Sequence, residues 1–248
     1  MPDTAQQAAT SAGPVDAVVL EDLVAANHIL VDQGVLDGFG HVSIRHPHAP
    51  NRYLMARNIA PDLVTAADIL EYDLDSNPID AKGQRTFLER FIHGEAYKAR
   101  PDVHAVIHSH SPTVVPFGIS SHALQPVFHM SGFLAVGVPV WDIRQAVGGP
   151  SNMLVTSIAL GKDLSVALGD KPVALMRGHG NVVVGPNLRI AVYRAVYTEI
   201  NARLQLQAQG LGGQLNFLTE EEGKMAEAII MTQIERPWQL WRKKAAGK

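Results

Sequence analysis

Three histidines have the residue type and the spacing to hold one metal ion. His108 and His110 are two residues apart at the end of a predicted β-strand. Side chains two residues apart lie on the same face of a strand, so both imidazoles can reach one ion. His179 stands between Gly178 and Gly180, and these glycines allow the backbone to approach closely and leave the ring unobstructed. Three neutral imidazoles with an open fourth position form a catalytic ligand set, which manganese, zinc, cobalt or iron can occupy.

Spacing alone leaves other interpretations open. Two histidines in a strand are often surface groups or a hydrogen-bonded pair, and spacing does not show that His179 meets them. A fourth candidate, Glu89, could act as a general acid or base beside the ion. The alternative is a solvent-facing carboxylate paired with Arg85 or Arg90, and from the residues alone this alternative is favoured.

The segments that must position these residues alternate between helices and strands. Apolar residues at helical spacing predict helices over 16–34, 86–100, 151–168, 187–209 and 219–241, the last with a break near Pro237. Short stretches rich in β-forming residues predict strands around Val42 and Ile44 and over 52–55, 69–73, 104–108, 172–176 and 181–184. This mixture indicates an α/β or α+β fold in one domain, residues 16–248, behind a flexible tail formed by residues 1–15.

Composition excludes several classes of protein. The chain has 248 residues and a formal net charge of −3, so no global field attracts nucleic acid or an anionic membrane. The absence of cysteine excludes disulfides, thiolate ligands and a cysteine nucleophile, and it fits a cytoplasmic location. No signal peptide is recognisable, and no window reaches the roughly 18 consecutive apolar residues of a membrane span.

The runs ERFIHGEAYKARPDVHAVIHSHSPTVV, MRGHGNVVVG and GFGHVSIR resemble the class II aldolase/adducin family over nearly the whole chain after residue 16. The resemblance implies a three-layer α/β/α fold around a mostly antiparallel sheet, and a homotetramer with active sites at subunit interfaces. It also implies that His108, His110 and His179 bind a divalent metal and that Glu89 is the acid/base carboxylate. Adducin-type members that lack the histidines are structural proteins, whereas this chain keeps all three.

The chain departs from the sugar-phosphate aldolases of this family where those enzymes hold phosphate. Phe87 and Leu88 stand in place of a Ser-Ser pair, and Met55–Asn58 (MARN) replaces a Thr-Pro-Thr-Gly-like turn. Neither replacement offers a cradle of hydroxyls for an anion. Arg57 could instead fork onto a carboxylate with two hydrogen bonds, although a surface arginine on a loop is an equal alternative.

With LERFIHGE, HSHSP and HMSGF, these departures resemble a decarboxylase branch of the family. That branch acts on hydroxylated aromatic dicarboxylates such as 3,4-dihydroxyphthalate or 3-hydroxy-2-methylpyridine-4,5-dicarboxylate. The resemblance implies a metal-dependent, non-oxidative decarboxylase, in which an ion stabilises the carbanion or enolate and Glu89 protonates it. We expect a small aromatic acid as the substrate, with Arg57, Asn58, Ser109 and His93 as its binding residues. The alternative is a class II aldolase that cleaves a non-phosphorylated hydroxy-carbonyl compound.

Overall fold

A seven-stranded sheet runs through the protein in the order β3-β2-β1-β4-β7-β6-β5. The structure is a computed structural model and describes residues 10–247. The strands are β1 (His41–His46), β2 (Ala49–Ala56), β3 (Ile69–Asp73), β4 (Ala105–Ser109), β5 (Val140–Trp141), β6 (Val173–Met176) and β7 (Gly180–Gly185). Neighbouring strands are antiparallel except for the β5–β6 pair. The expected mostly antiparallel sheet is therefore confirmed.

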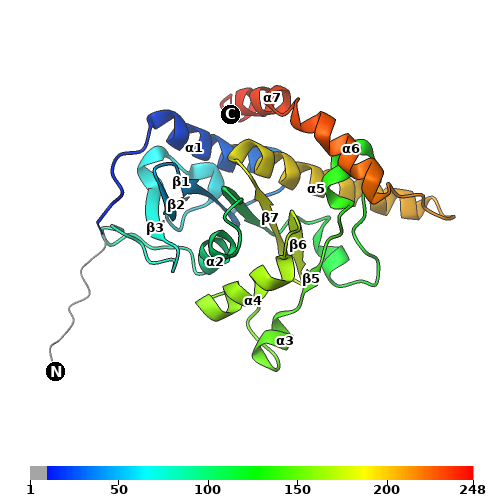
Figure 1. The fold of residues 1–248 in the computed structure, drawn as a ribbon, viewed down its shortest axis with the longest axis horizontal. Helices are drawn as coiled ribbons and strands as arrows, with labels where there is room; N and C mark the ends of the chain where they lie inside the picture. The colour runs from blue at the N-terminus through cyan, green and yellow to red at the C-terminus, as the bar shows by residue number, and fades with distance from the viewer. Residues whose placement is uncertain (1–9, 248) are drawn as a thin grey trace.

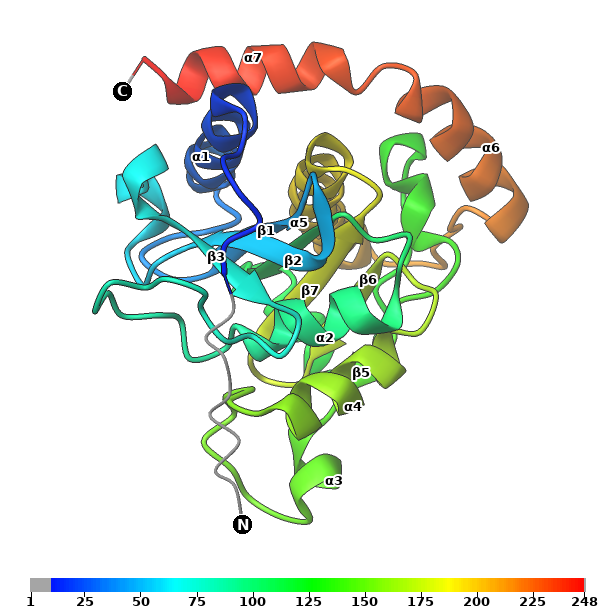
Figure 2. The same cartoon turned by 60° about the vertical axis from the view of Figure 1, so that its left-hand side comes forward.

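Helices cover both faces of this sheet, which gives three layers (Figure 1). The helices of the described chain are α1 (Ala17–Asp32), α2 (Phe91–Ala99), α3 (Ile143–Val147), α4 (Ile158–Leu168), α5 (Leu188–Gly210), α6 (Glu220–Met231) and α7 (Glu235–Ala245). Helices α1 and α5 pack on one face and α2 and α4 on the other. Helix α7 crosses over α1 and α5 on the outside, as Figure 2 shows. The expected α/β/α architecture is confirmed.

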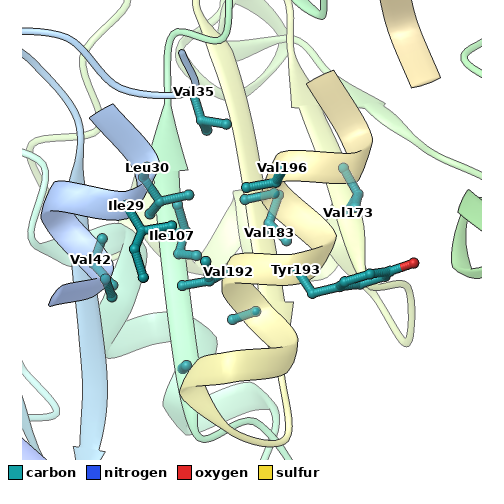
Figure 3. Packing of buried hydrophobic residues seen from close by; sticks show 14 of the residues in the cluster. Ile29, Leu30, Val35, Val42, Ile107, Val173, Val183, Val192, Tyr193 and Val196 are labelled. Carbon is teal, nitrogen blue, oxygen red and sulfur yellow. The ribbon is translucent and has the colours of Figure 1, made fainter. Parts of the chain in front are cut away.

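Alternation along the strands divides the hydrophobic core into two clusters, one on each face. Val42 of β1 and Ile107 of β4 pack with Ile29, Leu30 and residues of α5 (Figure 3). Val106 and Val184, on the opposite face, pack against residues of α2 and α4 instead. Because successive side chains of a strand point to opposite faces, His108 falls on the α2 side of the sheet and Ser109 on the α5 side.

Two predicted helices begin later in the chain than the sequence indicated. Helix α2 begins at Phe91 and not at residue 86, so Glu89 lies in the turn before the helix. Helix α4 begins at Ile158 and not at residue 151. The Ser157 hydroxyl caps α4 by accepting a hydrogen bond from a backbone N–H of its first turn, and Met153 has a φ of +71°, which a right-handed helix excludes. Residues 151–157 therefore form a loop whose backbone groups are free to bind other parts of the protein.

The segment 219–241, predicted as a helix with a break near Pro237, forms two helices, α6 and α7, and the break lies at residues 232–234, before the proline. Pro237 lies in the first turn of α7, where its missing N–H has no helical partner to lose. Proline therefore marks the beginning of a new helix here. No described helix combines the length and the apolar character that crossing a membrane requires.

The predicted N-terminal tail is only partly described. Residues 1–9 lie outside the described residues. The Ser11 hydroxyl and the Ala12 N–H donate hydrogen bonds to the Glu71 carboxylate on β3, at 2.6 and 3.0 Å. These bonds attach the following part of the tail to the sheet.

Candidate active site

Glu89 and the three predicted histidines meet beside the end of β4. One ligand atom from each residue lies within 4.8 Å of all the others. The Nε2 atoms of His110 and His179 are 3.1 Å apart. Two imidazole nitrogens that bind one tetrahedral zinc ion at about 2.0–2.1 Å are separated by about 3.3 Å. The spacing of the cluster therefore fits a single divalent ion.

Backbone carbonyls fix the orientation of two of the three imidazoles. Nδ1 of His108 lies 3.1 Å from the carbonyl oxygen of Asn181, and Nδ1 of His179 lies 2.9 Å from that of Met153. A carbonyl only accepts hydrogen bonds, so each Nδ1 carries the proton and each Nε2 presents a lone pair to the cluster. Nε2 of His108 is buried without a hydrogen-bond partner. Because an unpaired buried polar atom is costly, the donor set is suited to a metal ion.

The glycines on either side of His179 allow its approach to β4, as the sequence predicted. Gly178 has a φ of +64°, in the left-handed region that favours glycine. A Cβ atom on Gly180 would lie 2.1 Å from the carbonyl oxygen of Ser109 and 3.2 Å from the His110 ring. Only glycine at position 180 lets the turn between β6 and β7 carry His179 so close to the other ligands.

Glu89 is buried and belongs to this cluster. Its Oε1 accepts a hydrogen bond of 2.9 Å from the Val155 N–H, and its Oε2 lies 3.4 Å from Nε2 of His179 and 3.6 Å from Nε2 of His108. Arg90 instead donates to the backbone carbonyls of Ser76 and Phe87. The interpretation of Glu89 as a solvent-facing partner of Arg90 is wrong.

The charge states of the cluster suit metal binding at neutral pH. Burial raises the pKa of the Glu89 carboxyl, but hydrogen bonds and positive charge from His108 and His179, when these rings are protonated in the metal-free cluster, lower it by more, so this pKa is well below its ordinary value. Burial, together with the neighbouring His108 and His179, lowers the pKa of His110 to about 4. At pH 7 the carboxylate is therefore ionised and His110 is neutral, which are the forms that bind a cation.

A pocket of about 440 Å³ opens beside the cluster. Its lining is mostly apolar and includes Phe39, Ile59, Phe87, Leu88 and Leu154, together with Asn58, His41, Glu89, His108 and His110. The size is within the usual range for a site that binds a small organic molecule, roughly 300–1,000 Å³. Flat and aliphatic walls around a few polar groups suit an aromatic acid.

The four predicted substrate-binding residues lie in different surroundings. Asn58 lines the pocket. Arg57 is not among the lining residues, and its Nε donates to Asp68 at 2.7 Å. His93 is fully buried in a hydrogen-bonded chain, and Ser109 is fully buried on the other face of the sheet with its hydroxyl on Asn181. Their roles toward a substrate stay predictions.

Two features of the site were not anticipated from the sequence. His41 lines the pocket and lies opposite His108 in the β1–β4 ladder, with the two rings 5.1 Å apart. The sequence indicates that His41 and Ser43 share one face of a strand, but it does not indicate which residue of the adjacent strand lies beside His41. The loop 151–157 supplies the Met153 carbonyl and the Val155 N–H. Every residue type has these backbone groups, so the sequence could not indicate their role in the site.

The sequence of the chain is similar to those of known proteins. Residues 21–206 match the family model of the class II aldolase and adducin N-terminal domain. The chain is 33% identical over 247 residues to decarboxylase tropJ of Talaromyces stipitatus, covering 91% of this chain and 93% of that protein. It is 32% identical over 253 residues to 3,4-dihydroxyphthalate decarboxylase of Arthrobacter keyseri, covering 96% and 94%.

Solved structures share the fold at lower sequence identity. L-fuculose 1-phosphate aldolase from Glaciozyma antarctica PI12 superposes with a TM-score of 0.75 at 23% identity and 95% coverage of both chains. An aldolase II superfamily protein from Pseudomonas syringae gives a TM-score of 0.77 at 21% identity and 94% coverage of both.

Proposed function

The chain belongs to the class II aldolase and adducin family, and from this premise we propose that it is a metal-dependent, non-oxidative decarboxylase of a hydroxylated aromatic dicarboxylate. The observation that carries the proposal is the wall of the pocket beside the four-residue cluster. Phe87 and Leu88, which precede Glu89 and stand where the sugar-phosphate aldolases have serines, both line it. An apolar wall at this point suits an aromatic ring better than a phosphate. The similarity to 3,4-dihydroxyphthalate decarboxylase supports a phthalate-type substrate, and a pyridine-type dicarboxylate of the same shape is included in the proposal.

His108, His110 and His179 would hold the ion, with Mn²⁺ or Zn²⁺ favoured and Co²⁺ or Fe²⁺ also suited to imidazole ligands. When bound, the ion supplies a positive charge that draws electron density away from the carbon that loses CO2. Asn58 can donate a hydrogen bond to a substrate oxygen from the pocket wall. Arg57, from the same loop, would turn from Asp68 to orient a carboxylate.

Glu89 is placed to move the proton that decarboxylation requires. Val155 holds Oε1, so Oε2 is the carboxylate oxygen that faces the cluster. Since Glu89 is ionised at neutral pH, any proton that it delivers must first be taken up. We infer that Oε2 takes the proton of the substrate hydroxyl, directly or through a water molecule, and passes it to the ring carbon as CO2 leaves. The carbon–carbon bond is then replaced by a carbon–hydrogen bond, and the hydroxyl recovers its proton from solvent.

We further propose that the protein is a cytoplasmic homotetramer with its active sites at subunit interfaces. Phe39 is 70% exposed and Leu88 59% exposed, and both belong to the pocket lining. A neighbouring subunit would cover these apolar side chains and close the pocket. Light scattering on the purified protein tests the assembly, and a monomer at micromolar concentration would contradict it.

The proposed reaction is tested by CO2 release from a panel of hydroxyphthalates and hydroxypyridine dicarboxylates. We expect release with Mn²⁺ or Zn²⁺ and none with excess EDTA. His108→Ala should lose both the bound metal and the activity, because the buried Nε2 lone pair is gone. His122→Ala, at an exposed histidine outside the cluster, is the matched control.

Product analysis distinguishes the proposed reaction from its rival. A class II aldolase acting on a non-phosphorylated hydroxy-carbonyl compound would use the same cluster but would form an aldehyde without CO2. An aldehyde product, or CO2 release that survives both EDTA and His108→Ala, would overturn the proposal.

A further inference from the structure

A chain of four buried side chains runs from helix α2 to the pocket. The Tyr97 hydroxyl lies 2.8 Å from Oγ of Ser43, and that Oγ lies 2.6 Å from Nδ1 of His93. Nε2 of His93 lies 2.6 Å from Nδ1 of His41. All four residues are buried, and His41 is the one that lines the pocket. The chain therefore ends at the site, on a residue to which the proposed reaction assigns no role.

We propose that His41 is a further substrate-binding residue, and that Tyr97, Ser43 and His93 fix the proton of its imidazole on Nε2, where it can be donated to an anionic substrate oxygen. Tyr97, Ser43 and His93 act only through His41 and are positioning residues. The fixed proton follows from the described contacts, whereas the identity of the bound oxygen rests on the proposed function.

Which group donates in each of these hydrogen bonds follows from the Tyr97 end of the chain. Oγ of Ser43 is the only hydrogen-bond partner of the Tyr97 hydroxyl among the described residues. A buried O–H without an acceptor is costly, so Tyr97 must donate to Oγ of Ser43. The Ser43 proton then points the other way, to Nδ1 of His93.

The two imidazoles continue this order. A neutral imidazole has one N–H and one lone pair, and burial favours the neutral form of both rings. His93 accepts at Nδ1 and must therefore donate from Nε2 to Nδ1 of His41. His41 accepts at Nδ1, and its own proton is left on Nε2.

The only hydrogen bond of the His41 ring among the described residues is made by Nδ1, so Nε2 is without a partner there, and the ring lines the pocket. The His41 ring lies between the rings of Phe87 and His108, with centroid-to-centroid distances of 4.7 and 5.1 Å. An N–H fixed beside the metal cluster attracts an anionic oxygen, such as a carboxylate or an ionised hydroxyl. The reversed order would present a lone pair that repels the same oxygen and would leave the Tyr97 O–H unpaired.

The tautomers can be read directly by NMR. In the full chain labelled with ¹⁵N-histidine and loaded with diamagnetic Zn²⁺, multiple-bond ¹H–¹⁵N spectra show which nitrogen of each ring is protonated, and His41→Gln assigns the His41 signals. We expect His41 and His93 each to be protonated on Nε2 alone. A proton on Nδ1 of His41 would overturn the proposal, whether or not any variant folds.

Two variants that each remove one hydroxyl test the chain itself. Ser43→Ala removes the only donor to Nδ1 of His93 in the chain, so both rings should become mixtures of tautomers. Tyr97→Phe keeps the Ser43 hydroxyl but removes the donor that turns the Ser43 proton toward His93, so this variant should also give mixtures of tautomers. Unchanged spectra in a folded Ser43→Ala protein would overturn the positioning role.

Binding of phthalate, which lacks the hydroxyl groups of the proposed substrates, tests the pocket end of the chain. His41→Phe keeps a flat ring but removes the donor, and we expect the Kd measured by calorimetry to rise about 10- to 100-fold. His122→Phe should leave it unchanged. An unchanged Kd in His41→Phe would overturn substrate binding by His41. If no hydroxyphthalate releases CO2, the proposed function fails, but the tautomer and phthalate results stand independently.

Discussion

Acid should destabilise the metal-free protein through His93. Burial and the neighbouring His108 lower the pKa of His93 to about 3 in the folded state, whereas an unfolded histidine titrates near 6.5. The unfolded chain therefore binds one more proton than the folded chain between these two values. The contribution of His93 to stability is fully present above pH 6.5, and it is lost as the pH falls toward about 3.

The size of the effect follows from the two pKa values. At about 1.4 kcal/mol per pH unit, His93 contributes a loss of roughly 2 kcal/mol between pH 7.5 and 5, and of roughly 4 kcal/mol by pH 3. The loss of stability between pH 7.5 and 5 is due to histidines and not to carboxylates, because most carboxylates titrate below pH 5. Lowered pKa values of His41 and His110 add to the slope in the same direction.

Urea unfolding followed by circular dichroism, in EDTA between pH 7.5 and 5, measures this loss. His93→Gln should be less stable than the wild type at pH 7.5, because it disturbs the buried hydrogen bonds of His93. Because glutamine does not titrate, the free energy of unfolding of this variant should fall by roughly 2 kcal/mol less than that of the wild type between pH 7.5 and 5. His122→Gln, at an exposed site, should keep the wild-type slope. A free energy of unfolding that is flat in the wild type, or equally steep in His93→Gln, would refute the reasoning.

Three further perturbations test the site. Glu89→Gln should lower turnover about 10²- to 10⁴-fold while zinc content, measured by elemental analysis, is retained, because three imidazoles remain; unchanged turnover would exclude proton transfer by Glu89. Gly180→Ala should cost about 1–3 kcal/mol in urea unfolding and weaken zinc binding, because its Cβ would lie 2.1 Å from a carbonyl oxygen, whereas Gly210→Ala, with open space around it, should do neither. Arg57→Ala should raise KM for a dicarboxylate about tenfold or more, with Arg52→Ala as the control, and an unchanged KM would remove Arg57 from the site.

Regular elements were largely predictable because their apolar residues repeat with a period that one chain displays. The helices at 16–34 and 187–209 and the strand at 69–73 agree with α1, α5 and β3 to within two residues. The loop 151–157 was predicted as helix because its composition is compatible with one. Its actual conformation depends on Val155 and Met153 binding Glu89 and His179, which lie far away in the sequence.

Residue types and spacing by themselves determined that His108 and His110 share one face of a strand and that glycines make room around His179. They also determined that apolar side chains, not hydroxyls, precede Glu89. Only the tertiary structure decided that Glu89 is buried among these histidines and that His41 joins them through β1. The physical reason is that a ligand cluster is made by strand register and by backbone hydrogen bonds between distant segments. Local periodicity fixes which face a side chain occupies, but only packing fixes what it meets there.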